Sequence, residues 1–282
     1  MKTVVLILIL AGAAYLAFRF LTGQKYKKSL FGTQKINEIS KEIPLKGNVF
    51  ANWWVVEHGL FLSFRSKKNE LNLYTAFILK WILEGKINVI PNARSKRRVS
   101  MGLKLDTPFT DRTEMNLYEM LLAASGSDYI LEANEFKRWA RRNYQLIEQY
   151  PRRADVRGKR YLIAKGYMGE DKKAIPSMYP QLCKPIEFKN YLKSLDLSLN
   201  QPQPGQWKDY LVIGTLFGYT NKMLKQLKAQ IPTSFRDYAR SINNIDPSEL
   251  LYDIEAAQLM ASKGFKAAKE EQERDDEIRN NR

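Results

Sequence analysis

The stretch LNLYTAFILKWILEGKINVI, residues 71–90, combines a strongly apolar helical pattern with the start of a β-strand. In its first part, large apolar side chains recur on one broad face at helical spacing: Leu71, Tyr74, Phe77, Ile78, Trp81 and Ile82. Gly85 predicts the end of this helix, and residues 86–90 have the composition of a strand. We therefore expect a core helix that is followed directly by a β-strand.

A second helix and a second strand are predicted on either side of this stretch. Residues 48–60 carry apolar side chains at helical spacing, and residues 99–105 have the pattern of a strand. The loop between the two strands is rich in arginine and lysine. Helices followed by a hairpin with a basic tip suggest a winged helix, so we predict a winged-helix-like unit over residues 43–110.

The rest of the chain is predicted to be mostly helical. Asp111, followed three residues later by Glu114, matches a capping-box start of a helix, and residues 111–170 are predicted as a second helical or winged-helix-like unit. Beyond a proline-containing linker, residues 186–231 are predicted as a helical subdomain. Residues 232–282 are predicted as a C-terminal helix with a charged tail.

The N-terminus carries a long apolar run. Residues 3–18 contain no charged side chain, and the run suits a transmembrane anchor over residues 1–22, with a juxtamembrane linker over residues 23–42. A cleaved secretory signal is the alternative, but cleavage at the candidate site would leave apolar residues behind. Lysines follow the segment, which favours a cytoplasmic bulk. We therefore expect a single-pass inner-membrane protein of the α+β class, mostly α, with the winged-helix-like units and the helical subdomain after its transmembrane helix.

The chain is strongly basic, with 46 Lys and Arg against 30 Asp and Glu and a formal charge of +16 over 282 residues. Such a charge favours anionic partners, either lipid headgroups or nucleic acid, although basic runs are often only solvated faces. Base readout is not favoured, because the helix before the hairpin has Lys80 as its one basic residue in 71–84. The candidate contacts to an anionic surface are Arg94, Lys96, Arg97, Arg98, Lys137, Arg138, Arg141, Arg142, Arg152 and Arg153.

Few residues suggest catalysis. The chain has one histidine and one cysteine, which excludes a zinc site built from the usual ligands, and no motif of a known cofactor site occurs. His58 is predicted to lie at a helix C-terminus, and Cys183 fits a reducing compartment. Asp106, Asp111 and Glu114 could pair or hold a divalent cation, but helix capping explains the last two more simply. We expect no catalytic, cofactor or metal site.

Two segments resemble the cytoplasmic domain of the YciQ-like predicted membrane proteins, a bacterial family of unknown function. One is IEFKNYLK, residues 186–193, followed by WKDYLVIG, residues 207–214, and then by Gly218. The other is AFILKWI, residues 76–82, ahead of Gly85, with a matching stretch at residues 42–44. The resemblance implies membrane attachment and supplies no catalytic residues.

These observations predict a scaffold or interaction module at the inner membrane surface, with an unidentified protein partner. A membrane-tethered nucleic-acid-binding protein that uses the arginine clusters is the first alternative. An enzyme with carboxylate chemistry is the second, and it would require a concave pocket that gathers acidic groups with perturbed pKa values.

Overall fold

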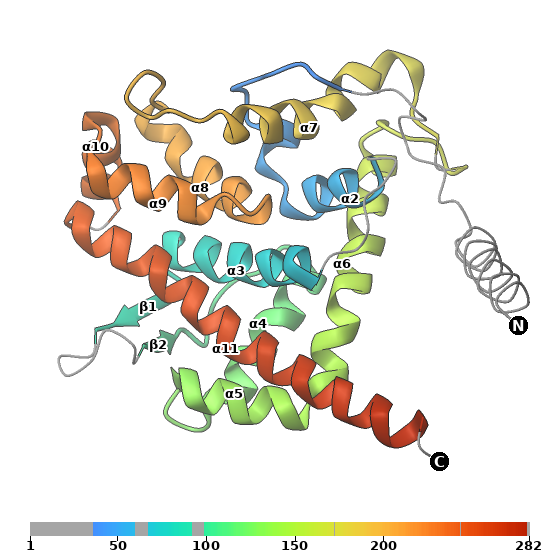
Figure 1. Cartoon of the computed structure of the whole chain (residues 1–282), viewed down its shortest axis with the longest axis vertical. Helices are drawn as coiled ribbons and strands as arrows, with labels where there is room; N and C mark the ends of the chain where they lie inside the picture. Colours follow the sequence, from blue (N-terminus) through green and yellow to red (C-terminus); the bar gives the residue numbers. More distant parts are fainter. Residues whose placement is uncertain (1–35, 60–66, 92–98, 172, 243, 281–282) are drawn as a thin grey trace, which may run out of the picture.

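The computed structural model describes residues 36–59, 67–91, 99–171, 173–242 and 244–280, and it is mostly helical with one small sheet (Figure 1). The main helices are α2 (Val49–Gly59), α3 (Lys67–Leu83), α4 (Arg112–Ser125), α5 (Ala133–Arg142), α6 (Tyr144–Ala164), α7 (Tyr179–Lys193), α8 (Trp207–Leu216), α9 (Thr220–Ala229), α10 (Thr233–Ser241) and α11 (Pro247–Asn280). The strands are β1 (Ile87–Ile90), β2 (Ser100–Leu103) and β3 (Ile130–Glu132), and the short 3₁₀ turns are η1 (Pro44–Gly47), η2 (Pro176–Met178) and η3 (Pro204–Gln206). The α+β, mostly helical class is therefore as expected.

Helix α3 lies at the centre of the molecule, between α11 and α8 (Figure 1). Phe77 and Trp81 share one face of the helix and Leu79 lies on the opposite face, yet all three are fully buried. A helix that is apolar on all sides is usually covered on all sides. The strand predicted after it is also present, as β1, so the expectations for residues 71–90 are confirmed.

The three strands form one antiparallel sheet in the order β1-β2-β3. Ile87 lies opposite Leu103, and Met101 lies opposite Leu131. Strand β3 follows α4, beyond residue 110, where the first predicted unit ends. The sheet therefore includes strands from both predicted units, residues 43–110 and 111–170. The winged-helix interpretation is not supported, because α3, which would have to be the exposed recognition helix, is committed to the core.

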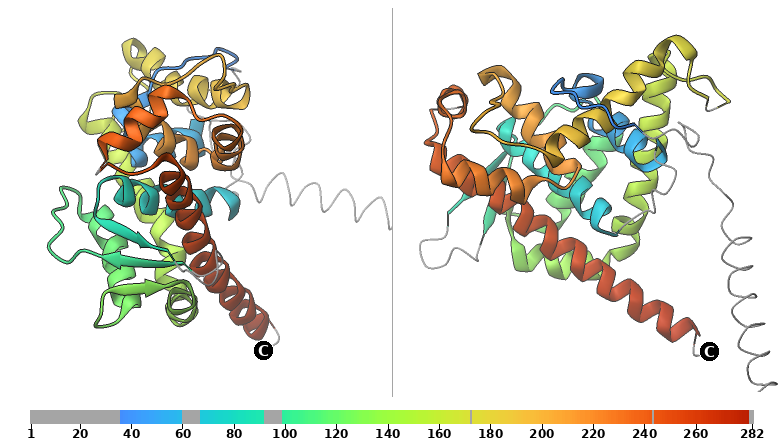
Figure 2. Two further views of the ribbon diagram at one scale, coloured as in Figure 1. Left: turned by 90° about the vertical axis from the view of Figure 1, so that its left-hand side faces the viewer. Right: turned by 45° about the horizontal axis from the view of Figure 1, so that its top comes forward.

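Helix α11 is longer and more buried than the sequence indicates. The expected charged tail continues the same helix to Asn280, and it packs along α5 and α6 (Figure 2). Gly264 allows the closest approach, since a β-carbon there would lie 2.1 Å from Cε1 of Phe136. Beyond it, Arg141 binds Glu270 at 2.8 Å. The acidic side chains of the tail are therefore partly used in contacts with the basic helix α5.

Prolines do not divide the chain as expected. Within the predicted unit over residues 111–170, helices α5 and α6 meet at Asn143, and Pro151 lies inside α6. Helix α7 starts at Tyr179, before the predicted start, and contains Pro185. A proline inside a helix removes one backbone hydrogen bond, and its ring crowds the preceding turn. Pro151 and Pro185 are both buried, and packing in the core offsets these two costs.

The membrane assignment is corrected. No helix in the described ranges is long and apolar enough to cross a bilayer, and the predicted anchor, residues 1–22, lies outside those ranges. The transmembrane topology and the inner-membrane localisation that depended on it are therefore not supported. Of the predicted linker, residues 36–42 are described, and Asn190 on α7 donates hydrogen bonds from Nδ2 to the carbonyl oxygens of Ile36 and Glu38.

Candidate functional site

The basic residues singled out in the sequence lie on three segments of the chain, of which the structure describes two. Arg94, Lys96, Arg97 and Arg98 lie outside the described residues. Lys137, Arg138, Arg141 and Arg142 lie on α5, where Arg141 is paired with Glu270 of α11. Arg152 and Arg153 lie on α6 and line a shallow depression of about 350 Å³ together with Thr113, Val156, Arg157 and Arg160.

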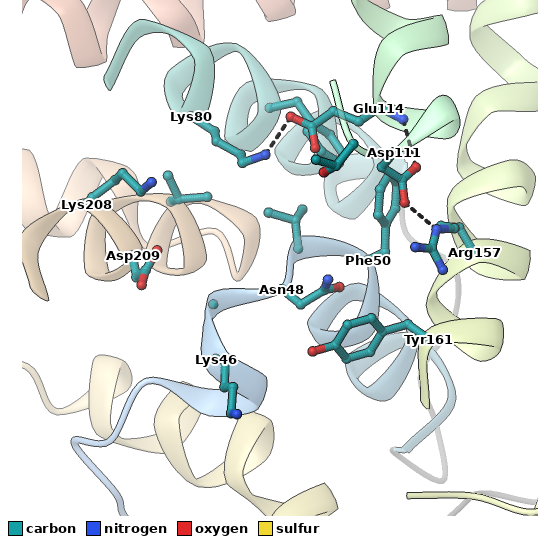
Figure 3. A pocket seen from close by; sticks show the side chains of 15 residues that line it. Lys46, Asn48, Phe50, Lys80, Asp111, Glu114, Arg157, Tyr161, Lys208 and Asp209 are labelled. Carbon is teal, nitrogen blue, oxygen red and sulfur yellow. Dashed lines mark hydrogen bonds and ion pairs between the residues drawn. The ribbon is translucent and has the colours of Figure 1, made fainter. Parts of the chain in front are cut away.

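A more enclosed pocket of about 410 Å³ lies where η1 and helices α2, α3, α4, α6 and α8 meet (Figure 3). Figure 3 shows the polar side chains that surround it, of which Lys46 points away from the others. They include four cations and three carboxylates: Lys46, Lys80, Arg157, Lys208, Asp111, Glu114 and Asp209. Asp111 and Glu114 were considered from the sequence as a carboxylate pair, whereas Asp106 does not line this pocket.

Asp111 is held by the helix that it caps. Its Oδ1 accepts hydrogen bonds from the backbone N–H groups of Thr113 at 2.9 Å and Glu114 at 3.2 Å, so the predicted helix start is confirmed. Its Oδ2 accepts a hydrogen bond from Nε of Arg157 on α6. Both oxygens are therefore occupied.

Glu114 turns into the core instead of completing the capping box. Its Oε1 accepts hydrogen bonds from Nζ of Lys80 at 2.5 Å and from Nε1 of Trp81 at 2.8 Å. A buried carboxylate needs such partners, because an unpaired charge in the interior is costly. Glu114 and Lys80 therefore fix α4 against α3 at the wall of the pocket.

Glu84, just outside the pocket, forms ion pairs with Lys86 and Lys208. Its carboxyl oxygens lie 3.0 Å from Nζ of Lys86 and 3.3 Å from Nζ of Lys208. Burial alone would raise the pKa of Glu84, but Lys80, Lys86 and Lys208 together hold it below its usual value. Glu84 is therefore ionised, and its negative charge partly neutralises the ammonium group of Lys208.

Asp209, in the first turn of α8, differs from the other two pocket carboxylates. It forms neither an ion pair nor a hydrogen bond with any residue that the structure describes. Burial raises its pKa above the usual value, and the nearby Glu84 adds to this effect, whereas Lys208 and Lys80 oppose it. A carboxyl group with a raised pKa in a pocket is a candidate acid–base group.

The turn η1 forms the side of the pocket that faces Asp209, and its backbone is unusual. Leu45, Lys46 and Gly47 have φ values of 48°, 53° and 69°, so three consecutive residues are left-handed. Such a conformation is unfavourable for Leu and Lys. Asn52, fully buried on α2, holds the turn by donating from Nδ2 to the carbonyl oxygens of Pro44 and Asn48.

The turn places Lys46 at the edge of the pocket. Its side chain is exposed and forms no ion pair among the described residues. Backbone strain of this kind persists only where surrounding contacts enforce it, and it is concentrated at functional sites. Lys46 and Asp209 are therefore an unpaired cation and an unpaired carboxyl group at one pocket.

His58 is separate from this pocket. It lies at the C-terminal end of α2, as expected, stacks on Trp54 with ring centroids 4.7 Å apart, and contacts Asp155 of α6 through Nε2 at 2.5 Å. No group of three or more potential metal ligands occurs in the ranges that the structure describes.

Comparisons of the chain with protein-family models, with curated proteins and with solved structures found no match. The resemblance to the YciQ-like proteins stays a prediction. The function must therefore be inferred from the pocket itself.

Proposed function

We propose that the protein binds a small polar molecule in the central pocket and that Asp209 exchanges a proton with it. The observation that carries this proposal is that Asp209 is unpaired among the described residues and has a pKa raised by burial. Both oxygens of Asp111 and Oε1 of Glu114 are bonded to Arg157, Lys80, Trp81 and the backbone of α4, so these two carboxylates shape the pocket.

The charges of the pocket suggest the class of ligand. Asp209 suits a hydroxyl or ammonium group, which can donate a hydrogen bond to its carboxylate form. Lys46 at the edge suits an anionic group on the same molecule. A volume of about 410 Å³ accommodates a small metabolite, whereas a helix of double-stranded nucleic acid would not enter it.

This proposal develops the carboxylate-chemistry alternative, which required a concave pocket that gathers acidic groups with perturbed pKa values. Three carboxylates line the pocket, and the pKa of Asp209 is raised. General acid–base catalysis depends on a group whose pKa is moved toward the working pH, and burial moves the pKa of Asp209 in that direction.

The test is a thermal-shift screen of the full chain against small hydroxy acids, amino acids and sugar phosphates. A ligand of this pocket should raise Tm of the wild type, and the shift should be lost in Asp209→Asn and reduced in Lys46→Ala. Asp237→Asn, which removes an exposed carboxylate from α10, is the matched control and should keep the shift. A ligand that stabilises Asp209→Asn as much as the wild type would contradict the proposal.

A further inference from the structure

A second groove, of about 570 Å³, lies on another part of the molecule, between β1 and the start of α11. Ile87 and Val89 line one side, and Ile245 and Tyr252 line the other. Figure 1 shows β1 below the N-terminal half of α11. The groove is thus mainly apolar and is bounded on one side by a strand.

Strand β1 is at the edge of the sheet, because among the described strands it pairs with β2 alone. Lys104 donates its backbone N–H to the carbonyl oxygen of Lys86 at 3.2 Å, and the register places Asn88 opposite Gly102. In an antiparallel ladder the bonded positions alternate. Lys86, Asn88 and Ile90 therefore bond to β2, and the backbone groups of Ile87 and Val89 point away from β2. Ile87 is buried, so the accessible N–H and C=O groups on this edge are those of Val89.

Two carboxylates line the facing wall. Glu249 and Asp253 are one helical turn apart on α11, and neither forms an ion pair with a described residue. Burial, with repulsion from Glu249, raises the pKa of Asp253 to about 7. The hydroxyl oxygen of Tyr252, between them in sequence, is buried and has no hydrogen-bond partner in the described part of the chain. This wall therefore offers hydrogen-bond acceptors and negative charge, and no cation of the described residues forms an ion pair with it.

We propose that the groove binds an extended peptide segment of a partner protein, which adds a strand to β1 and places a lysine or arginine side chain against Glu249 and Asp253. The outward N–H and C=O groups of Val89 provide the backbone hydrogen bonds for such an addition, and pockets beside a strand edge select alternate side chains. Here the apolar walls accept aliphatic side chains, and the acidic pair selects the cation. This site is independent of the central pocket and of the function proposed for it.

The test is fluorescence anisotropy of the full chain with a labelled peptide mixture, in which a central lysine is flanked by alternating threonine and valine, isoleucine or tyrosine. The mixture should bind, and replacing the lysine by glutamate should abolish binding. Glu249→Gln and Asp253→Asn should each weaken binding by about tenfold, the effect of losing one charge-assisted contact. Glu249 is exposed, so its replacement leaves the fold intact. Glu277→Gln, which removes an exposed charge from the far end of α11, should bind as the wild type does.

The strand geometry has its own test. In an added β-strand, alternate peptide N–H groups face β1. N-methylation of one alternate set of amides should therefore abolish binding, and N-methylation of the other set should leave it largely intact. Asp209→Asn should not change peptide binding, which separates this site from the central pocket. Lack of binding by the mixture, equal binding by both methylated forms, or unchanged binding by Glu249→Gln would overturn the proposal.

Discussion

Gly47 lies against Asp209 in the wall of the central pocket, so closely that a β-carbon on Gly47 would lie 2.8 Å from Cγ of Asp209. Gly47 also has φ of +69°, which favours glycine. The residue therefore meets two requirements at once: it completes the left-handed turn η1, and it leaves room for the carboxyl group on α8.

Replacement of Gly47 by alanine should destabilise the protein and weaken ligand binding in the pocket. The left-handed backbone costs about 1 kcal/mol for alanine, and the contact with Asp209 adds to it. Urea denaturation should show a lower midpoint. Gly205→Ala is the control, since a β-carbon there meets nothing within 4 Å, and it should change the midpoint little. Equal effects of the two substitutions would contradict the role of Gly47.

Gly158→Ala should also destabilise the fold, although alanine is the better helix former by about 1 kcal/mol. A β-carbon at Gly158 on α6 would lie 2.2 Å from the carbonyl oxygen of Phe50, so α2 would have to move away. We expect a loss of about 2 kcal/mol in the free energy of unfolding. Val156→Ala, at an exposed position of the same helix, should have a much smaller effect. A stabilised Gly158→Ala variant would show that α2 and α6 are not packed this closely.

Asp253 should make stability depend on pH. Its pKa is about 7 in the folded protein and near 3.8 when unfolded, so the folded state holds the proton more tightly. The stability from this proton is complete below about pH 4 and is lost as the pH rises through 7. Asp253→Asn should therefore match the wild type at pH 4 and exceed it at pH 8, by an amount on the order of 2 kcal/mol. Denaturation curves that differ equally at both pH values would rule out this titration.

Cys183 should react slowly with thiol reagents. Its side chain is buried, and burial, together with Glu187 and Glu38, raises the pKa of the thiol to about 11. The reactive thiolate is then about a thousandth of the total at pH 8. Alkylation by iodoacetamide should be at least about a hundredfold slower than that of glutathione, and it should become fast in urea. Rapid alkylation of the folded chain at pH 8 would contradict this environment.

The sequence alone determined the main local elements. The apolar spacing of residues 71–84, the strand pattern after Gly85 and the carboxylate at Asp111 each predicted an element that is present, because helical and strand periodicity and capping depend on neighbours within a few residues. The same patterns did not show which faces meet. A helix followed by a hairpin has the same local pattern whether the helix is exposed to DNA or enclosed by α8 and α11, and this ambiguity led to the winged-helix prediction.

Only the tertiary structure brought Gly47, Lys46 and Asp209 together. In the sequence, Asp209 lies within an aromatic and aliphatic helix that is explained by core packing, and nothing there indicates that its carboxyl group is unpaired. Its raised pKa results from burial against η1, and β1 borders a groove only because α11 crosses beside it. Both sites arise where elements distant in the chain pack together, and that arrangement depends on the fit of the whole core, which local periodicity does not specify.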